Sequence, residues 1–120
     1  MSEQTTEQRV EHCLFCSIAA GEIPADVVLD EPDIVAFRDI APQAPLHVLV
    51  IPRGHHRDIA AVVRDDAELG GRMLAAAAAL AEEFGGDYRL VANTGPEAGQ
   101  SVWHAHVHVL AGRPMGWPPG

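Results

Sequence analysis

The sequence predicts an α+β domain in which one long helix packs on a five-stranded, mostly antiparallel sheet, with a short N-terminal helix beside it. The long helix is predicted over residues 65–84, where alanine and leucine dominate, two aspartates begin the segment and Gly85-Gly86 end it. The strands are predicted from five apolar runs of strand length that turn residues separate: residues 27–29, 34–37, 46–51, 88–92 and 102–110.

The domain organisation is simple. A chain of 120 residues is long enough for one ordinary core, and it contains no internal repeat or linker. We expect residues 1–11, which are polar and acidic, to form a flexible tail, and residues 12–120 to form the single domain. The short helix is predicted over residues 13–20, because Gly21 ends it and Pro24 prevents its continuation.

The charge of the chain argues against two classes of partner. Lysine and arginine total 8 against 17 acidic residues, which gives a net charge of −9. Duplex nucleic acid and anionic membranes bind basic surfaces, so neither is an expected partner. No apolar stretch approaches the length of a membrane-spanning helix, and the N-terminus lacks the basic start of a signal peptide. We therefore expect a cytoplasmic protein that binds any phosphate through local donors.

The strongest chemical pattern is the run of alternating histidines His104, His106 and His108. Residues two apart on a strand share a face, so the intervening residues should pack on the core: Trp103, Ala105, Val107 and Val109. A polar sheet face, a histidine-only metal site and nucleophilic or acid–base chemistry are three possible interpretations. The adjoining segment, residues 93–101, is rich in small and polar residues that suit an oxyanion, and this favours the third.

Residues 99–110, Gly-Gln-Ser-Val-Trp-His-Ala-His-Val-His-Val-Leu, resemble the signature of the histidine triad (HIT) family, His-φ-His-φ-His-φ-φ with φ apolar. The C-terminal residues 112–120 resemble the nucleotide-binding Hint branch of that family. So do residues 13–16, 21–25, 36–40 and 41–47. The resemblance extends from Cys13 to Gly120 and implies a HIT-like fold.

The resemblance also implies an activity, namely hydrolysis of purine nucleoside 5′-phosphoramidates such as adenosine 5′-monophosphoramidate. In that reaction the middle histidine, here His106, attacks the α-phosphorus and forms a nucleotidyl-histidine, which water then hydrolyses. A homodimer with a sheet continued across the interface and an AMP-type purine nucleotide as ligand are implied as well. The alternatives are a dinucleoside polyphosphate hydrolase, a nucleotidyl transferase, or a nucleotide-sensing module that binds without turnover.

Individual residues take roles from the same resemblance. The catalytic set is His106, His108, His47 and Ser101, in which His47 orients the histidine cluster and Ser101 and His108 help the leaving group depart. Asp39 binds the ribose, apolar side chains surround the base, and the remaining residues surround the phosphate: Leu14, Phe15, Ile18 and Ile40 for the base; Asn93, Gly99, Gln100, Ser101 and His108 for the phosphate. An attacking imidazole needs its other nitrogen hydrogen-bonded, and the strand offers no acidic residue for this. We therefore expect a backbone carbonyl to orient His106.

Cys13 and Cys16, the only cysteines, have the spacing of half a zinc site. His55 and His104 match the positions that complete this site in zinc-binding HIT proteins. Four protein ligands leave no open position, so such a zinc would be structural and catalysis would require no cofactor. The alternatives are two small buried thiols, or a catalytic metal held by the three alternating histidines.

Overall fold

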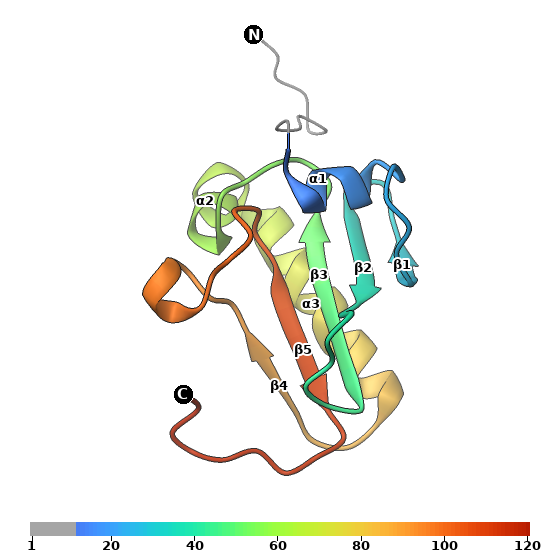
Figure 1. The fold of residues 1–120 in the computed structure, drawn as a ribbon, viewed down its shortest axis with the longest axis vertical. Coiled ribbons are helices and arrows are strands. Elements are labelled where there is room, and N and C mark those ends of the chain that lie inside the picture. Colours follow the sequence, from blue (N-terminus) through green and yellow to red (C-terminus); the bar gives the residue numbers. More distant parts are fainter. Residues whose placement is uncertain (1–11) are drawn as a thin grey trace, which may run out of the picture.

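The computed structural model describes residues 12–120, so the tail predicted over residues 1–11 lies outside the described residues. Five strands form one sheet in the order β1-β2-β3-β5-β4, and every neighbouring pair is antiparallel (Figure 1). The strands are β1 (Val27–Asp30), β2 (Ile34–Arg38), β3 (Leu46–Pro52), β4 (Tyr88–Val91) and β5 (Val107–Ala111). The predicted α+β class and antiparallel sheet are confirmed.

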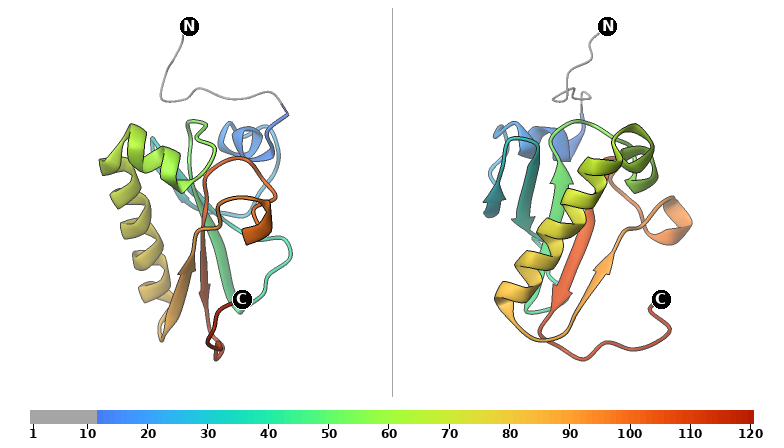
Figure 2. Two further views of the ribbon diagram at one scale, coloured as in Figure 1. Left: turned by 90° about the vertical axis from the view of Figure 1, so that its left-hand side faces the viewer. Right: turned by 180° about the vertical axis from the view of Figure 1, so that it is seen from behind.

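The helices divide between the two faces of the sheet. The long helix α3 (Ala67–Phe84) crosses one face, whereas α1 (Leu14–Ala19) and the short 3₁₀ turn η1 (Pro96–Ala98) lie on the other side (Figure 2). Two clusters of buried residues follow from this layering: one joins α3 to the sheet, and a smaller one lies around Phe15 of α1. No helix in residues 12–120 combines the length and apolar character needed to cross a membrane.

Local sequence explains how α3 begins and how closely it packs. The Asp66 side chain accepts a hydrogen bond from the backbone N–H of Leu69, which caps the first turn. Ala77 and Ala81 are fully buried, because their small side chains let the helix lie close to the sheet. Helix α2 (Ile59–Asp65) was not predicted, although Asp58 caps it in the same way by accepting from the backbone N–H of Ala61.

The fifth strand is shorter at its N-terminus than predicted. Residues 102–110 were expected to be extended throughout, but β5 begins only at Val107, opposite Val50 of β3. Continuing this register would place Ala105 opposite Pro52, which has no N–H to donate. The Ala105 N–H instead donates to the carbonyl of His56. The first two of the three alternating histidines therefore lie just before the strand.

Gly112, directly after β5, is the glycine that the fold tolerates changing least. Its φ is +101°, and a Cβ there would lie 2.8 and 2.9 Å from Cβ and Cγ of Pro45. We expect Gly112→Ala to lower the free energy of unfolding by about 2–4 kcal/mol, as measured by denaturant unfolding. Gly85 has the same φ with open space around it, so Gly85→Ala should cost only about 1 kcal/mol. Equal losses of unfolding free energy in the two variants would show that the close approach to Pro45 contributes nothing to the destabilisation by Gly112→Ala.

Candidate functional site

A cluster of three histidine rings lies where β3 and β5 run side by side. His108 on β5 is paired with Leu49 and His47 on β3 with Leu110, so the two histidines are diagonal neighbours on one face of the sheet. His47 Nε2 lies 3.0 Å from His108 Nδ1, and the ring centres of His106 and His108 are 5.1 Å apart. The hydrogen bond that the family resemblance implied for His47 is thus present.

The backbone sets which nitrogen of His106 is free. His106 Nδ1 lies 2.8 Å from the carbonyl oxygen of His104, and a carbonyl can only accept, so Nδ1–H donates. In the neutral ring the lone pair is then on Nε2, which is the nitrogen available for attack. The expectation that a backbone carbonyl orients this ring is confirmed.

The alternation of side chains along residues 103–109 is largely as predicted. Ala105, Val107 and Val109 are buried in the cluster that packs against α3. Trp103 is the exception: it is 42% exposed, and the Arg57 guanidinium lies over its ring at 4.9 Å. The prediction that Trp103 packs on the core is wrong, because the chain enters the sheet only at Val107, after this position.

Packing buries the histidine rings and keeps His47 and His108 neutral near pH 7. The Phe15 ring meets the His106 ring edge-on at 5.1 Å and the His104 ring at 6.0 Å. Burial lowers the pKa of His108 to about 4, helped by the nearby His106 and His47, and opposed by Asp39. Burial likewise lowers the pKa of His47. Near neutral pH, His47 and His108 are therefore uncharged.

A second group of side chains lies on the α1 side of the site. The Cys13 thiol is 3.4 Å from His104 Nδ1, and the Cys16 thiol is 3.4 Å from His55 Nδ1 and 3.5 Å from His104 Nδ1. The four candidate ligand atoms all lie within 4.8 Å of one another. His104 Nε2 donates to the Pro52 carbonyl at 2.8 Å, so its Nδ1 lone pair faces the thiols. This arrangement suits a four-coordinate metal.

The three alternating histidines do not share one metal position. Within residues 12–120 the side chains that could together hold a metal form two groups: the cysteine-containing group above, and Asp39 with His47 and His108. His104 belongs to the first group and His108 to the second, while His106 belongs to neither. The alternative of a catalytic metal held by all three histidines therefore does not fit the geometry.

The loop that adjoins the histidines is held mainly by its own hydrogen bonds. Gln100 is buried; its Oε1 accepts from the Gly95 N–H, and its Nε2 donates to carbonyls of Arg57 and Val102. The N–H groups of Gly99 and Gln100 donate to Pro96 and Gly95 within the loop. Both residues shape the loop, and the Asn93 carboxamide lies beside Gly99. Ser101 is exposed and lines a hollow with Cys13, Leu14 and His55.

Two of the residues expected to bind the nucleoside, Asp39 and Phe15, lie against the histidine cluster. The Asp39 carboxylate accepts from the Ala41 N–H at 2.8 Å and lies 3.5 Å from His47 Nε2. Of the apolar residues, Ile40 is fully exposed and Leu14 is 46% exposed, whereas Phe15 is buried. Ile18 is partly buried against the Phe15 cluster. Phe15 is therefore a wall behind the histidines rather than a free stacking surface.

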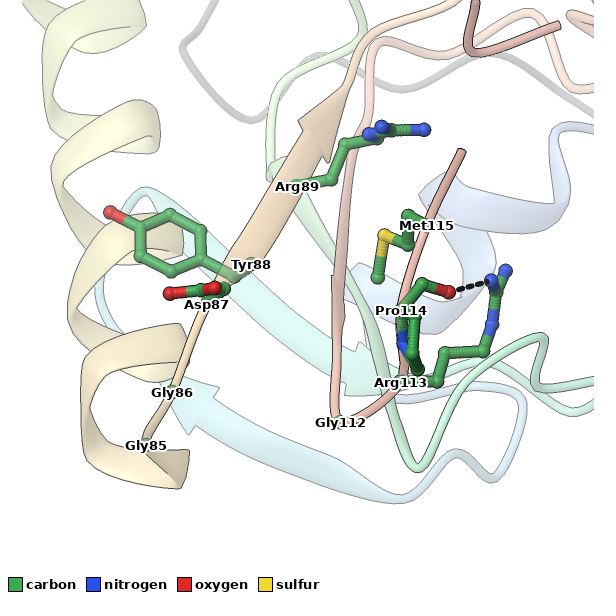
Figure 3. Close-up of a pocket in the computed structure, with 9 residues that line it drawn as sticks. All are labelled: Gly85, Gly86, Asp87, Tyr88, Arg89, Gly112, Arg113, Pro114 and Met115. Carbon is green, nitrogen blue, oxygen red and sulfur yellow. Dashed lines mark hydrogen bonds between the residues drawn. The ribbon is translucent and has the colours of Figure 1, made fainter. Parts of the chain in front are cut away.

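A hollow of about 650 Å³ lies away from this chemistry, between the start of β4 and the C-terminal tail (Figure 3). Its lining contains no histidine or cysteine, so it is not the reactive site. Arg53, directly after β3, is not available to a phosphate at this hollow or at the histidines, because its guanidinium is engaged by other groups. Its guanidinium donates to the carbonyls of Ala19 and Glu31 and pairs with Asp30, and so ties α1 to the β1–β2 turn.

Sequence reasoning missed one contributor to the cluster. The backbone N–H of Gln43, in the loop before β3, donates to His47 Nδ1 at 3.0 Å. The donor is a backbone group, so the identity of residue 43 gives no signal of it. Only the position of the loop relative to β3 reveals this contact.

An antiparallel sheet that places alternating histidines beside a loop of small residues defines a histidine triad domain. The chain belongs to the HIT family, and the HIT domain model matches residues 20–115. HIT-like proteins from Synechococcus elongatus and Synechocystis are 44% and 45% identical to it over 112 residues, 92% of this chain and 98% of each relative.

Solved structures agree with this assignment. A HIT family hydrolase from Legionella pneumophila is 52% identical, with a TM-score of 0.87, and covers 91% of this chain and 100% of its own. A HIT family hydrolase from Clostridium thermocellum is 37% identical, with a TM-score of 0.84, over 90% of this chain and 96% of its own.

Proposed function

We propose that this protein is a hydrolase that cleaves the phosphorus–nitrogen bond of purine nucleoside 5′-phosphoramidates. The observation that carries the proposal is the hydrogen bond from His106 Nδ1 to the His104 carbonyl, which leaves Nε2 as a nucleophile. The chain's membership of the HIT family and its similarity to HIT family hydrolases support the same reaction class.

The reaction has two displacements at the α-phosphorus. His106 Nε2 forms a bond to phosphorus while the phosphorus–nitrogen bond breaks, and the amine leaves with a proton that comes from solvent by way of the Ser101 hydroxyl; His108 also assists its departure. Water then displaces the histidine, releasing the nucleoside monophosphate and restoring the ring. A covalent intermediate replaces one difficult substitution by two easier ones.

Recognition of the nucleotide falls to residues around the cluster. Asp39 binds the ribose hydroxyls, and the exposed side chains of Leu14 and Ile40 are available to contact the base, as is Ile18, which is partly buried against the Phe15 cluster. Asn93 and Ser101 surround the phosphate, with Gly99 and Gln100 shaping the loop. These sites suit an AMP-type purine nucleotide as ligand.

The substrate class is tested by comparing turnover of adenosine 5′-monophosphoramidate, of a diadenosine polyphosphate, and of a nucleotide donor mixed with an acceptor for nucleotidyl transfer. We expect kcat/KM for the phosphoramidate to exceed that for the diadenosine compound by about 100-fold or more, because the two leaving groups differ in charge and in contacts. Preference for the diadenosine compound would replace the proposal by a dinucleoside polyphosphate hydrolase. Binding of AMP without any turnover would make the protein a nucleotide-sensing module.

We also propose that Cys13, Cys16, His55 and His104 hold one structural zinc ion. Their ligand atoms converge, and the His104 tautomer fixed by Pro52 leaves Nδ1 free to ligate. When bound, zinc would cross-link α1 to the segments after β3 and before β5. Since four protein ligands leave no position for water, the ion would take no part in the hydrolysis.

A homodimer formed through β4 completes the proposal. β4 is an outer strand of the sheet, and its exposed Tyr88 lies beside the hollow in Figure 3. Pairing β4 with its copy would continue the sheet across the interface. Sedimentation equilibrium should give twice the chain mass, and a single chain mass at micromolar concentration would contradict this.

A further inference from the structure

The histidine beside the nucleophile is held by a chain of hydrogen bonds whose direction can be worked out. The chain starts at the backbone N–H of Gln43, which lies 3.0 Å from His47 Nδ1. A backbone N–H can only donate, so Nδ1 of His47 must accept and carries no proton. Burial lowers the pKa of His47, which keeps the ring neutral near pH 7. Its single proton is therefore on Nε2.

The His47 Nε2–H has two acceptors within reach. His108 Nδ1 is 3.0 Å away, and Asp39 Oδ2 is 3.5 Å away. The shorter contact is within hydrogen-bonding distance, so the proton is directed mainly at His108 Nδ1. A neutral His108 that accepts at Nδ1 has to carry its own proton on Nε2.

We infer that the Gln43 peptide, acting through His47, locks His108 as a neutral ring with Nε2–H, a fixed hydrogen-bond donor for the phosphoryl group attacked by His106. This inference rests on the proposed function and assigns the chemical form of one of its groups. The two rings then have complementary roles. His106 offers a lone pair on Nε2, and His108, whose ring centre is 5.1 Å away, offers an N–H.

The chemistry of the chain decides what His108 does with this proton. Transferring it would leave an imidazolate, because Nδ1 of His108 accepts from the neutral His47 and no proton-donating acid within residues 12–120 hydrogen-bonds to either ring. His108 therefore donates a hydrogen bond to a phosphoryl oxygen, where negative charge develops, without giving up its proton. His108 then assists the leaving amine by hydrogen bonding alone, and the exposed Ser101 hydroxyl is the group that passes a proton to it.

Arg113 extends the chain to the segment after β5. Its Nε donates to the Gln43 carbonyl at 2.7 Å, and its Nη1 donates to the Pro114 carbonyl at 3.0 Å. The guanidinium thus fixes the loop residue whose N–H sets the His47 tautomer. Within residues 12–120 the Arg113 side chain donates to the Gln43 and Pro114 carbonyls and not to His47 or His108, so it is a positioning residue for the pair.

The same geometry argues against a competing use of this cluster. Asp39, His47 and His108 bring three ligand atoms within 4.8 Å of one another, a spacing that a metal ion also tolerates. His47 Nε2 would have to lose its proton to ligate, while Nδ1 is already engaged by Gln43. In contrast, His104 ligates through Nδ1 and donates through Nε2 to a carbonyl. The hydrogen-bond direction therefore favours the donor chain over a metal.

The tautomers are measured by NMR of the protein labelled with ¹⁵N-histidine, near pH 7 and without substrate. We expect Nε2–H signals and unprotonated Nδ1 for His47 and His108, and the opposite tautomer for His106. An Nδ1–H or imidazolium form of His47 or His108 would overturn the inference. The measurement needs no turnover: if these tautomers hold and no phosphoramidate is cleaved, the proposed function fails but the hydrogen-bond chain stands.

Two pairs of variants test the chain. Gln43→Pro removes the donor N–H, whereas Gln43→Ala keeps it. Arg113→Gln releases the Gln43 carbonyl. As the control, Arg72→Gln removes the same charge from a partly exposed ion pair between Arg72 on α3 and Asp33 in the β1–β2 turn.

We expect Gln43→Pro and Arg113→Gln to mix the His47 and His108 tautomers and to lower kcat by about 10-fold with KM little changed. Both controls should behave as wild type. Arg113→Gln provides the test if Gln43→Pro fails to fold. Wild-type tautomers in a folded Arg113→Gln variant would refute the role of Arg113, and wild-type tautomers in folded Gln43→Pro would refute the chain.

Discussion

His106→Asn is expected to lower kcat for an adenosine phosphoramidate by about 10⁴-fold or more while leaving the protein folded. Asparagine can still donate from its side-chain amide to the His104 carbonyl, as His106 Nδ1–H does at 2.8 Å. It has no nitrogen lone pair where Nε2 stands. The variant therefore removes the nucleophile and keeps most of the local polar contacts, so that lost activity reports on chemistry rather than on folding.

Two independent measurements test for the covalent intermediate on His106. Mass spectrometry of acid-quenched wild type should find a nucleotidyl adduct on the peptide containing His106, absent from His106→Asn. A short-lived adduct can escape trapping, so a phosphorothioamidate of defined configuration is hydrolysed in isotopically labelled water. Two displacements give net retention at phosphorus, and one direct attack by water gives inversion.

His56→Gln is the matched control, since His56 pairs with Asp65 at the surface and lies outside the cluster. It should retain wild-type kcat. Inversion at phosphorus, or undiminished turnover by His106→Asn, would eliminate the histidine mechanism.

The sequence was most informative where local pattern determines structure. The caps and alanines of α3, the turn between β1 and β2 and the alternation of Ala105, Val107 and Val109 all follow from residue type and spacing. The orientation of His106 was also predictable, because its acceptor is a carbonyl two residues away in the chain. Each of these features depends on atoms close together along the chain.

The features that escaped prediction depend on distant partners. The start of β5 is set by Pro52 on β3, and the exposure of Trp103 follows from that. Gln43 and Arg113 act on the histidines through backbone groups, which carry no sequence signal. The candidate zinc ligands were predicted partly from local pattern and partly not. The spacing of Cys13 and Cys16 alone indicated half of a metal site, but His55 and His104 were assigned only through the family resemblance.

Loss of zinc is expected to cost stability rather than catalytic chemistry. If free zinc exceeds the dissociation constant about 1,000-fold, binding contributes about 4 kcal/mol to the free energy of unfolding. For a domain of this size that corresponds to a fall in Tm of roughly 10–20 °C on removal of the ion. The loss is expected because α1, which carries Cys16 and Phe15, would lose its cross-link to His55 and His104.

Elemental analysis of purified protein and thermal unfolding with and without a chelator measure these quantities. Wild type should carry one zinc per chain, and His55→Gln should lose both the zinc and the chelator-sensitive part of Tm. His56→Gln, one residue along, should retain both. Metal-free wild type whose Tm is unaffected by zinc would contradict the site.

The effect of zinc on catalysis is measured separately. If the chelated protein, assayed well below its Tm, keeps its kcat, the ion stabilises the fold alone. A complete loss of kcat at that temperature would instead mean that zinc bound to His104 also positions the nucleophile, since the carbonyl that orients His106 belongs to that same residue.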